Sequence, residues 1–244
     1  MDVPQTAAIE KRHGGMCGRF AIDYLKLAQL IEIYALNASD DGSQYGELKE
    51  NNDYYPAHGE RHSATPIILE EKGKRILQPL RWDLVPSWWR KPLAEKKFVS
   101  FNARSDSLQE KATFKKAWIK GQRCLFPATS FYEWPDKNLI QPGIKRVAHK
   151  IRLQDRSIFS MAGIWDTCVV SDKDTPLRSC AIITVEANRS IADIPHTRMP
   201  AILKKEDEKK WLDRNIPPDT AFHMLHPYPA EACVIQRTEK PRYG

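Results

Sequence analysis

The sequence has few of the features that mark membrane, metal-binding or disulfide-rich proteins. Only five of its 244 residues are cysteine, and they are widely spaced with no CxxC pair. This pattern argues against a disulfide framework and a structural zinc site, and it favours a reducing compartment. The longest apolar runs are far too short to span a bilayer. We therefore expect no membrane, no metal and no cofactor.

The composition is otherwise that of an ordinary globular domain. Hydrophobic residues make up 41% and charged residues 28%, and no stretch resembles a linker long enough to divide the chain. One domain is therefore expected. The formal net charge of +7 suits a polyanionic partner such as nucleic acid, although enzymes of small metabolites carry similar surpluses.

Short strands and a few helices follow one another along the chain. We expect loops over residues 37–52 and 191–203, a loop over residues 54–68 that leads into a short strand at residues 67–69, and a hairpin turn at residues 72–74. The mixture predicts an α+β fold, a single domain with a curled, barrel-like, mainly antiparallel sheet and a few flanking helices. The expected helices cover residues 24–34, the segment around Phe114 and Trp118, 204–212 and 220–225, and the expected strands cover 75–85, 148–153, 157–165, 179–185 and 233–235.

Two terminal segments are expected to lie outside the domain of residues 16–238. Residues 1–15 have no apolar run, no periodicity and a flexible end at Gly14–Gly15. They are thus neither a signal peptide nor part of a core. We expect a disordered extension that is absent from, or removed in, the mature protein. Residues 239–244 are expected to form a tail.

The stretch MCGRF places the thiol of Cys17 directly after Met16. Cys17 becomes the first residue if translation starts at Met16 and the methionine is removed, or if a protease, the protein itself included, cuts before Cys17. A terminal cysteine carries an amine beside its thiol, so it captures an aldehyde first as an imine and then as a thiazolidine. The amine's pKa of roughly 7.7 to 8.0 leaves a useful fraction neutral. The alternative is an internal buried cysteine on a first strand.

Two further residues are anomalies in their surroundings. Glu133 follows a mostly apolar run and stands between Tyr132 and Trp134. Partial burial would raise its pKa and suit it to general acid/base work, and the alternative is a solvent-facing strand residue. His196 lies in IADIPHTRMPAIL, where two prolines make a rigid loop that would aim it into a cleft. A lone histidine is also compatible with a structural role.

Paired indoles stand beside cations at Trp88-Trp89-Arg90-Lys91. Single-stranded nucleic acid is held in this way, because bases stack on aromatic rings while cations follow the phosphates. In the alternative, one tryptophan packs into the core and the other caps it.

Six blocks of this chain occur in an order that resembles the SRAP family, the SOS-response-associated peptidase or abasic-site processing proteins. The blocks are MCGRF, RWDLVPSWW, FNARSD, RCLFPATSFYEW, MAGIW and HTRMPAIL, and they run from residue 16 to about residue 225. The resemblance implies a protein that binds single-stranded DNA. It also implies that the terminal cysteine forms a covalent thiazolidine with the ring-opened aldehyde of an abasic site, which shields the lesion during the DNA damage response.

The resemblance also implies roles for particular residues. Cys17 would be the nucleophile, and Asn102 would orient its amine or the open sugar. Glu133 would shuttle protons and His196 would assist ring opening. The implied contacts to DNA are made by Arg19, Arg104 and Arg198 with phosphates and by Trp88 and Trp89 with bases.

The chain departs from the family pattern at Tyr54-Tyr55-Pro56-Ala57-His58, where many members have Tyr-Asn-x-Ala-Pro. The expected partner is single-stranded DNA that contains abasic sites, bound by a monomer. The expected location is the nucleoid in a bacterium or the nucleus in a eukaryote.

Two rival functions remain open. One is a cysteine peptidase or amidohydrolase that uses Cys17, His196 and either Asn102 or Glu133, and self-cleavage before Cys17 would reconcile it with the cross-linker. The other is a non-covalent binder of single-stranded nucleic acid.

Overall fold

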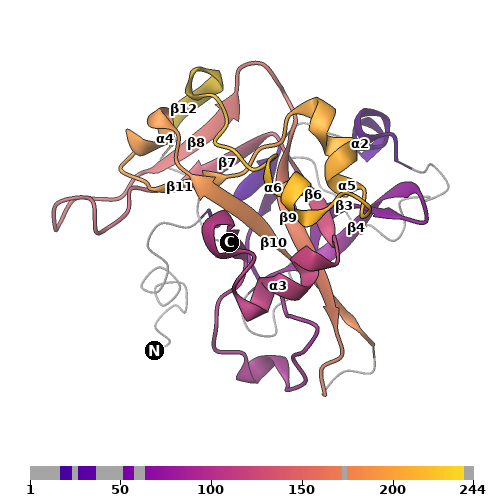
Figure 1. The fold of residues 1–244 in the computed structure, drawn as a ribbon. Helices are drawn as coiled ribbons and strands as arrows, with labels where there is room; N and C mark the ends of the chain where they lie inside the picture. The colour runs from indigo at the N-terminus through magenta and orange to yellow at the C-terminus, as the bar shows by residue number, and fades with distance from the viewer. Residues whose placement is uncertain (1–16, 24–26, 37–51, 58–63, 172–174, 239–244) are drawn as a thin grey trace.

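The computed structural model describes residues 17–23, 27–36, 52–57, 64–171 and 175–238. In these residues, twelve strands form two sheets that are flanked by five α-helices (Figure 1). The mixed α+β fold and the single domain confirm the predicted fold class. No helix in the described ranges is long and apolar enough to cross a membrane.

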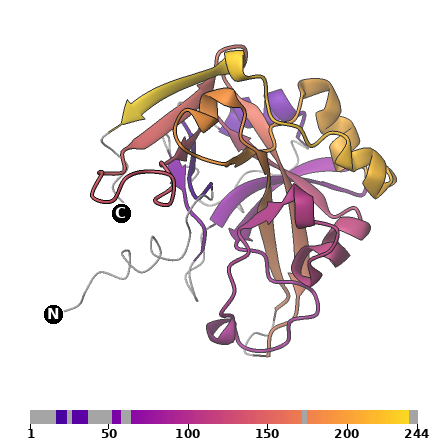
Figure 2. The same ribbon diagram turned by 60° about the vertical axis from the view of Figure 1, so that its left-hand side comes forward.

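The smaller sheet has five strands that all pair in antiparallel fashion. Figure 2 shows β12, in yellow, lying alongside β8 at one edge. Phe20 pairs with Tyr54 on one side and with Phe131 on the other, and all three rings are buried. The strand order is β12 (Cys233–Thr238), β8 (Ala148–Leu153), β7 (Ser130–Glu133), β1 (Phe20–Ile22) and β2 (Asn52–Tyr54).

The larger sheet curls into a ring-like arrangement. Its pairings lead from β3 through β4, β10, β9 and β6 back to β3, but the β3–β6 link is one residue pair and the β4–β10 link is two. Only β4 and β5 run parallel to their neighbour β10, so the predicted curled, mainly antiparallel sheet is confirmed. The seven strands are β3 (Ala64–Glu71), β4 (Lys74–Trp82), β5 (Asn102–Arg104), β6 (Arg123–Ala128), β9 (Phe159–Cys168), β10 (Leu177–Glu186) and β11 (Arg198–Pro200).

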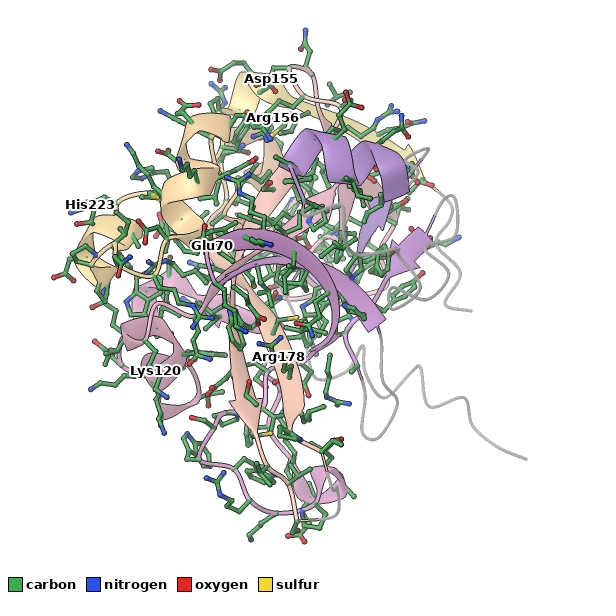
Figure 3. All side chains as sticks on the ribbon, turned by 90° about the vertical axis from the view of Figure 1, so that its right-hand side faces the viewer. Glu70, Lys120, Asp155, Arg156, Arg178 and His223 are labelled. Atoms are coloured by element: carbon green, nitrogen blue, oxygen red, sulfur yellow. The ribbon has the colours of Figure 1, made fainter. Side chains whose placement is uncertain are left out.

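Helices cover the outside of this sheet. The indoles of Trp118 on α3 and Trp211 on α5 lie 6.0 Å apart, and Trp211 Nε1 donates to the carbonyl of Cys124 on β6 at 2.9 Å. Arg156, labelled in Figure 3, donates to Glu208 of α5 at 2.7 Å. These contacts dock α5 against the strands. The helices are α2 (Leu27–Tyr34), α3 (Ala112–Ile119), α4 (Arg189–Ala192), α5 (Glu208–Leu212) and α6 (Pro218–Phe222).

Several local predictions are confirmed. The hairpin between β3 and β4 turns at Gly73, and α3 is followed by Gly121; both glycines have positive φ, at 75° and 62°. That backbone conformation carries no steric penalty for glycine.

Four predictions were wrong in part. Residues 54–68, expected to be a loop that leads into a short strand at residues 67–69, hold the end of β2 and the start of β3, so the expected strand is present but begins earlier, at Ala64. Residues 204–212 begin as a 3-10 turn, so only Glu208–Leu212 is α-helical. Residues 191–203 contain β11, which pairs with β10 at the edge of the sheet, where a proline needs no ladder partner for its missing N–H. In the expected loop at residues 37–52, Asn52 is instead the first residue of β2, while residues 37–51 and the two terminal segments lie outside the described residues.

Candidate active site

The four predicted catalytic residues come from four separate parts of the chain. Cys17 directly precedes β1, Glu133 ends β7, Asn102 begins β5, and His196 precedes β11. The sheets bring these segments together, because β1 pairs with β7 while β5 and β11 both pair with β10. All four side chains are buried.

Glu133 and His196 form a pair. His196 Nε2 lies 3.1 Å from Glu133 Oε2, and His196 Nδ1 lies 3.0 Å from the carbonyl oxygen of Trp134. A carbonyl oxygen only accepts, so Nδ1 carries a proton and donates it. The Nε2–Oε2 contact is a close approach rather than a directed hydrogen bond, because neither atom has a hydrogen-bond partner among the described residues.

Burial governs the acidity of this pair. It raises the pKa of Glu133 from 4.5 to about 7, although the nearby His196 opposes the shift. A carboxyl group with a pKa near neutrality exists in both protonation states at physiological pH. Glu133 therefore has the property required of a group that both takes up and releases protons.

The Cys17 thiol lies against Glu133. Glu133 and the backbone amide of Arg19 both act on the sulfur, although neither oxygen of Glu133 has a hydrogen-bond partner among the described residues. Complete burial, with the charge of Glu133 as the next cause, raises the pKa of Cys17 well above its ordinary value. The sulfur is therefore a neutral thiol at pH 7, and its proton must pass to a neighbouring base when the sulfur attacks.

Asn102 holds the backbone of the cysteine. Its side-chain amide donates to the Cys17 carbonyl at 2.8 Å. Its carbonyl oxygen, Oδ1, is buried and accepts no hydrogen bond from the described residues. Asn102 thus offers a buried hydrogen-bond acceptor beside Cys17.

Arg19 is fixed inside the smaller sheet. Its guanidinium lies between the rings of Tyr55 and Tyr132, with centroids 4.8 and 4.6 Å away, and it forms an ion pair with Asp53. Tyr55 is the residue at which the chain departs from the family pattern. Sequence reasoning missed Asp53 and this aromatic sandwich, because they come from strands distant along the chain.

Arg104 and Arg198 share a carboxylate. Arg104 on β5 is 56% exposed and bonds to Asp106 at 2.6 Å, while the side chain of Arg198 on β11 is 9% exposed and reaches Asp106 at 3.4 Å and the carbonyl of Thr184. Arg104 at the surface and the mostly buried Arg198 therefore converge on one carboxylate, each two residues after a candidate catalytic residue, Asn102 or His196. Sequence reasoning did not single out Asp106.

The two tryptophans have different environments. Trp88 is 45% exposed, stacks on Phe98 and donates to the carbonyl of Ala112 at 3.0 Å. Trp89 packs against a small apolar cluster that includes Val85 and Leu93. Trp88 therefore presents an accessible ring, whereas Trp89 is mainly a packing residue.

Asp83 is a further residue that sequence reasoning missed. It accepts two hydrogen bonds from Lys96 Nζ, at 2.8 and 2.9 Å, and others from the amide and hydroxyl of Ser100. These bonds close the tryptophan loop onto the segment that leads into Asn102. The only signal for it was the RWD block, where an acid follows a buried strand.

Cys17 and the Glu133–His196 pair form a cysteine-centred site on a curled α+β domain. Arg104 and Arg198 lie beside this site. Among the described residues, no group of three or more His, Cys, Asp or Glu side chains is placed to hold a metal ion. Proton transfer and cysteine chemistry are the capabilities that these residues supply.

The chain belongs to the SOS response associated peptidase (SRAP) family, whose model matches residues 16–240. It is 33% identical over 221 residues to the abasic site processing protein YoqW of Bacillus subtilis, covering 88% of this chain and 89% of that protein. It is 32% identical to the abasic site processing protein HMCES of Rattus norvegicus, covering 87% of this chain and 69% of that protein.

Solved structures have the same fold. A protein from Bacteroides thetaiotaomicron matches with a TM-score of 0.75 and 27% identity over 91% of both chains. A protein from Bordetella bronchiseptica matches with a TM-score of 0.72 and 23% identity over 91% of this chain and 99% of that chain.

Proposed function

We propose that this protein, once its chain begins at Cys17, binds single-stranded DNA at an abasic site and cross-links to it through a thiazolidine. The names of its relatives support the handling of abasic sites. The observation that carries the proposal is the burial of the Cys17 thiol beside Glu133, whose pKa is raised to about 7 and whose Oε2 lies 3.1 Å from His196 Nε2.

The chemistry begins with the sugar. An abasic deoxyribose is mostly a closed ring, and only its open form exposes the C1′ aldehyde. Opening the ring requires one proton to leave the C1′ hydroxyl and another to reach the ring oxygen. The Glu133–His196 pair has one group to accept and one to donate, so it would speed this step by general acid/base catalysis.

Capture then takes two bond-forming steps. The Cys17 amine adds to the aldehyde carbon, and the carbinolamine loses its hydroxyl as water after Glu133 protonates it, which gives an imine. The Cys17 sulfur adds to the imine carbon while its proton moves to nitrogen, and the five-membered thiazolidine closes. One water is lost in total. Asn102 would accept a hydrogen bond from the amine through its unpaired Oδ1 and keep it beside the aldehyde.

The proposal requires the segment before Cys17 to be removed. In the 244-residue chain, the nitrogen of Cys17 is in a peptide bond with Met16, and its thiol is fully buried. Hydrolysis of that bond consumes one water and releases the amine. The position of Cys17 beside Glu133 supports self-cleavage. Glu133 takes the thiol proton, the sulfur adds to the Met16 carbonyl, and the C–N bond breaks as that proton passes to the nitrogen. Water then hydrolyses the resulting thioester.

The reactivity of Cys17 separates this proposal from a general cysteine peptidase. Such an enzyme needs a thiolate, which a neighbouring cation usually stabilises. The pKa of Cys17 is instead raised by burial and by the charge of Glu133. This environment favours addition of a neutral thiol to an imine, and it limits peptidase activity to the one bond that the chain holds beside the sulfur.

The proposed setting is the DNA damage response, with a monomer acting where the DNA lies, at the nucleoid or in the nucleus. The test uses protein that starts at Cys17 and a labelled single-stranded oligonucleotide with one abasic site, run on a denaturing gel. A shifted band that depends on Cys17 supports cross-linking. A non-covalent binder or a peptidase gives no such band, and that result would overturn the proposal.

A further inference from the structure

The arginines and the candidate catalytic residues follow one repeating arrangement. On β5, Asn102 is followed two residues later by Arg104, and at β11, His196 is followed two residues later by Arg198. Asn102 and Arg104 both lie on β5, so they point to the same face about 7 Å apart, whereas His196 stands two residues before β11, which begins at Arg198. β10 runs between the two strands, because Thr184 pairs with Arg104 on one side and with Pro200 on the other. Arg104 and Arg198 therefore lie on the two strands that flank β10, each two residues further along the chain than Asn102 or His196.

Asp106 occupies the space between these arginines. Its carboxylate accepts from Arg104 Nε at 3.2 Å and Nη2 at 2.6 Å, and Arg198 Nη1 lies 3.4 Å away. The two arginines hold the pKa of Asp106 below its ordinary value, with the Arg104 hydrogen bond as the main cause. The carboxylate is thus held as an anion by the fork geometry that arginine also offers to a phosphate.

The pair formed by Arg104 and Arg198 also has an unused hydrogen-bond donor. Arg198 is buried, and its Nε has no hydrogen-bond partner among the described residues. The side chain of Asp106 is 48% exposed and belongs to a short 3-10 turn, Ser105–Ser107. It can therefore turn into solvent without opening the core, and a larger anion with more oxygens would satisfy more donors than the carboxylate does.

We propose that Asp106 is an internal competitor for DNA, and that its carboxylate stands in for the backbone phosphate next to the abasic sugar. A phosphate that enters between Arg104 and Arg198 must displace this carboxylate and lie near its negative charge. The competition weakens binding to every stretch of single-stranded DNA by the same factor. Only at an abasic site does the covalent step at Cys17 compensate for it, so Asp106 makes the protein more selective for lesions. The inference rests on the proposed function, since it assigns the phosphate position of that same site.

The test measures binding to DNA without a lesion, so that no covalent step contributes. Protein that starts at Cys17 is titrated into a fluorescently labelled single-stranded oligonucleotide, and anisotropy is recorded over a series of salt concentrations. The variants are Asp106→Asn and Asp106→Ala. The control is Glu110→Gln, which removes the same charge from an exposed side chain four residues away that forms no ion pair with the described part of the chain.

Both Asp106 variants are expected to bind about three- to tenfold more tightly than the wild type. The plot of log affinity against log salt should steepen by about 0.7, the slope expected for one more neutralised phosphate on a single strand. The DNA concentration that half-saturates cross-linking to an abasic oligonucleotide should fall in the same proportion. Glu110→Gln should change affinity less than twofold.

Weaker binding by both Asp106 variants, when thermal unfolding confirms that they are folded, would mean that Asp106 merely orients the arginines, and it would overturn the inference. Affinity equal to that of Glu110→Gln would overturn it too. Failure of the wild type to bind any single-stranded DNA would instead overturn the proposed function and the inference together. Because Asp106 is half-exposed on a surface turn, at least one of its variants should fold.

Discussion

The Glu133→Gln substitution tests two effects of this buried carboxyl: its effect on the free energy of unfolding and its effect on the rate of cross-linking. The glutamine amide has nearly the same shape, stays neutral at every pH, and carries a donor at the position that lies 3.1 Å from His196 Nε2. In the wild type, burial raises the pKa of Glu133 from 4.5 to about 7. The folded protein therefore holds this proton more tightly than the unfolded chain.

The sign and size of the effect follow from proton linkage. The stability that protonated Glu133 contributes is complete below pH 4.5 and is lost as the pH rises through 7. For these two pKa values, the free energy of unfolding of the wild type falls by about 2–3 kcal/mol between pH 5 and pH 8 from this group alone. Glutamine does not titrate, so the Glu133→Gln variant does not lose this contribution. Its free energy of unfolding relative to that of the wild type should therefore rise by the same amount between pH 5 and pH 8.

Urea denaturation of both proteins at pH 5, 6.5 and 8 measures this difference. Glu110→Gln serves as the control, since its side chain is exposed and its difference from the wild type should stay constant with pH. The same Glu133→Gln protein should cross-link to abasic DNA on the order of 100-fold more slowly, because it lacks the proton shuttle. A stability difference that does not change between pH 5 and pH 8 would refute the reasoning, because it would mean that the pKa of Glu133 is ordinary.

Three further substitutions test other parts of the account. Asn102→Ala removes the donor to the Cys17 carbonyl, so it should lower the free energy of unfolding by about 1–3 kcal/mol and slow cross-linking; normal cross-linking would contradict the positioning role. Arg104→Ala removes an exposed cation, so it should weaken binding to single-stranded DNA about three- to tenfold in anisotropy and flatten the salt slope by about 0.7; an unchanged slope would exclude a phosphate contact. Gly163→Ala would place a Cβ 2.4 Å from the ring of Phe126, so thermal unfolding should reveal a loss of about 1–3 kcal/mol, and wild-type stability would mean that the core relaxes there.

Short sequence patterns predicted the helices and turns whose conformation depends on residues that are close together in the chain. The turn before Lys74 and the helix of Phe114 and Trp118 are recognisable because glycine, helical spacing and aromatic residues occur within a few positions of one another. The strand β11 was missed because two prolines and a histidine disfavour a strand locally. Its pairing with β10, more than ten residues earlier along the chain, overrides that preference.

The site was predictable only through the order of its sequence blocks. Nothing in the surroundings of Glu133 predicts that His196, 63 positions further on, lies 3.1 Å away, because that contact depends on how the two sheets meet. The partners that were missed, Asp53 beside Arg19 and Asp106 between Arg104 and Arg198, are ordinary surface acids by composition. Only tertiary structure distinguishes them from the other carboxylates of the chain.

The mass of the cross-linked product tests the central claim most directly. Protein that begins at Cys17 is incubated with a single-stranded oligonucleotide that contains one abasic site, and the intact adduct and its peptides are weighed. The account predicts a mass equal to protein plus DNA minus one water, with the DNA attached to the peptide that starts at Cys17, and no adduct from a chain whose Cys17 nitrogen stays blocked. An adduct of equal yield from the blocked chain, or attachment at a lysine, would contradict it.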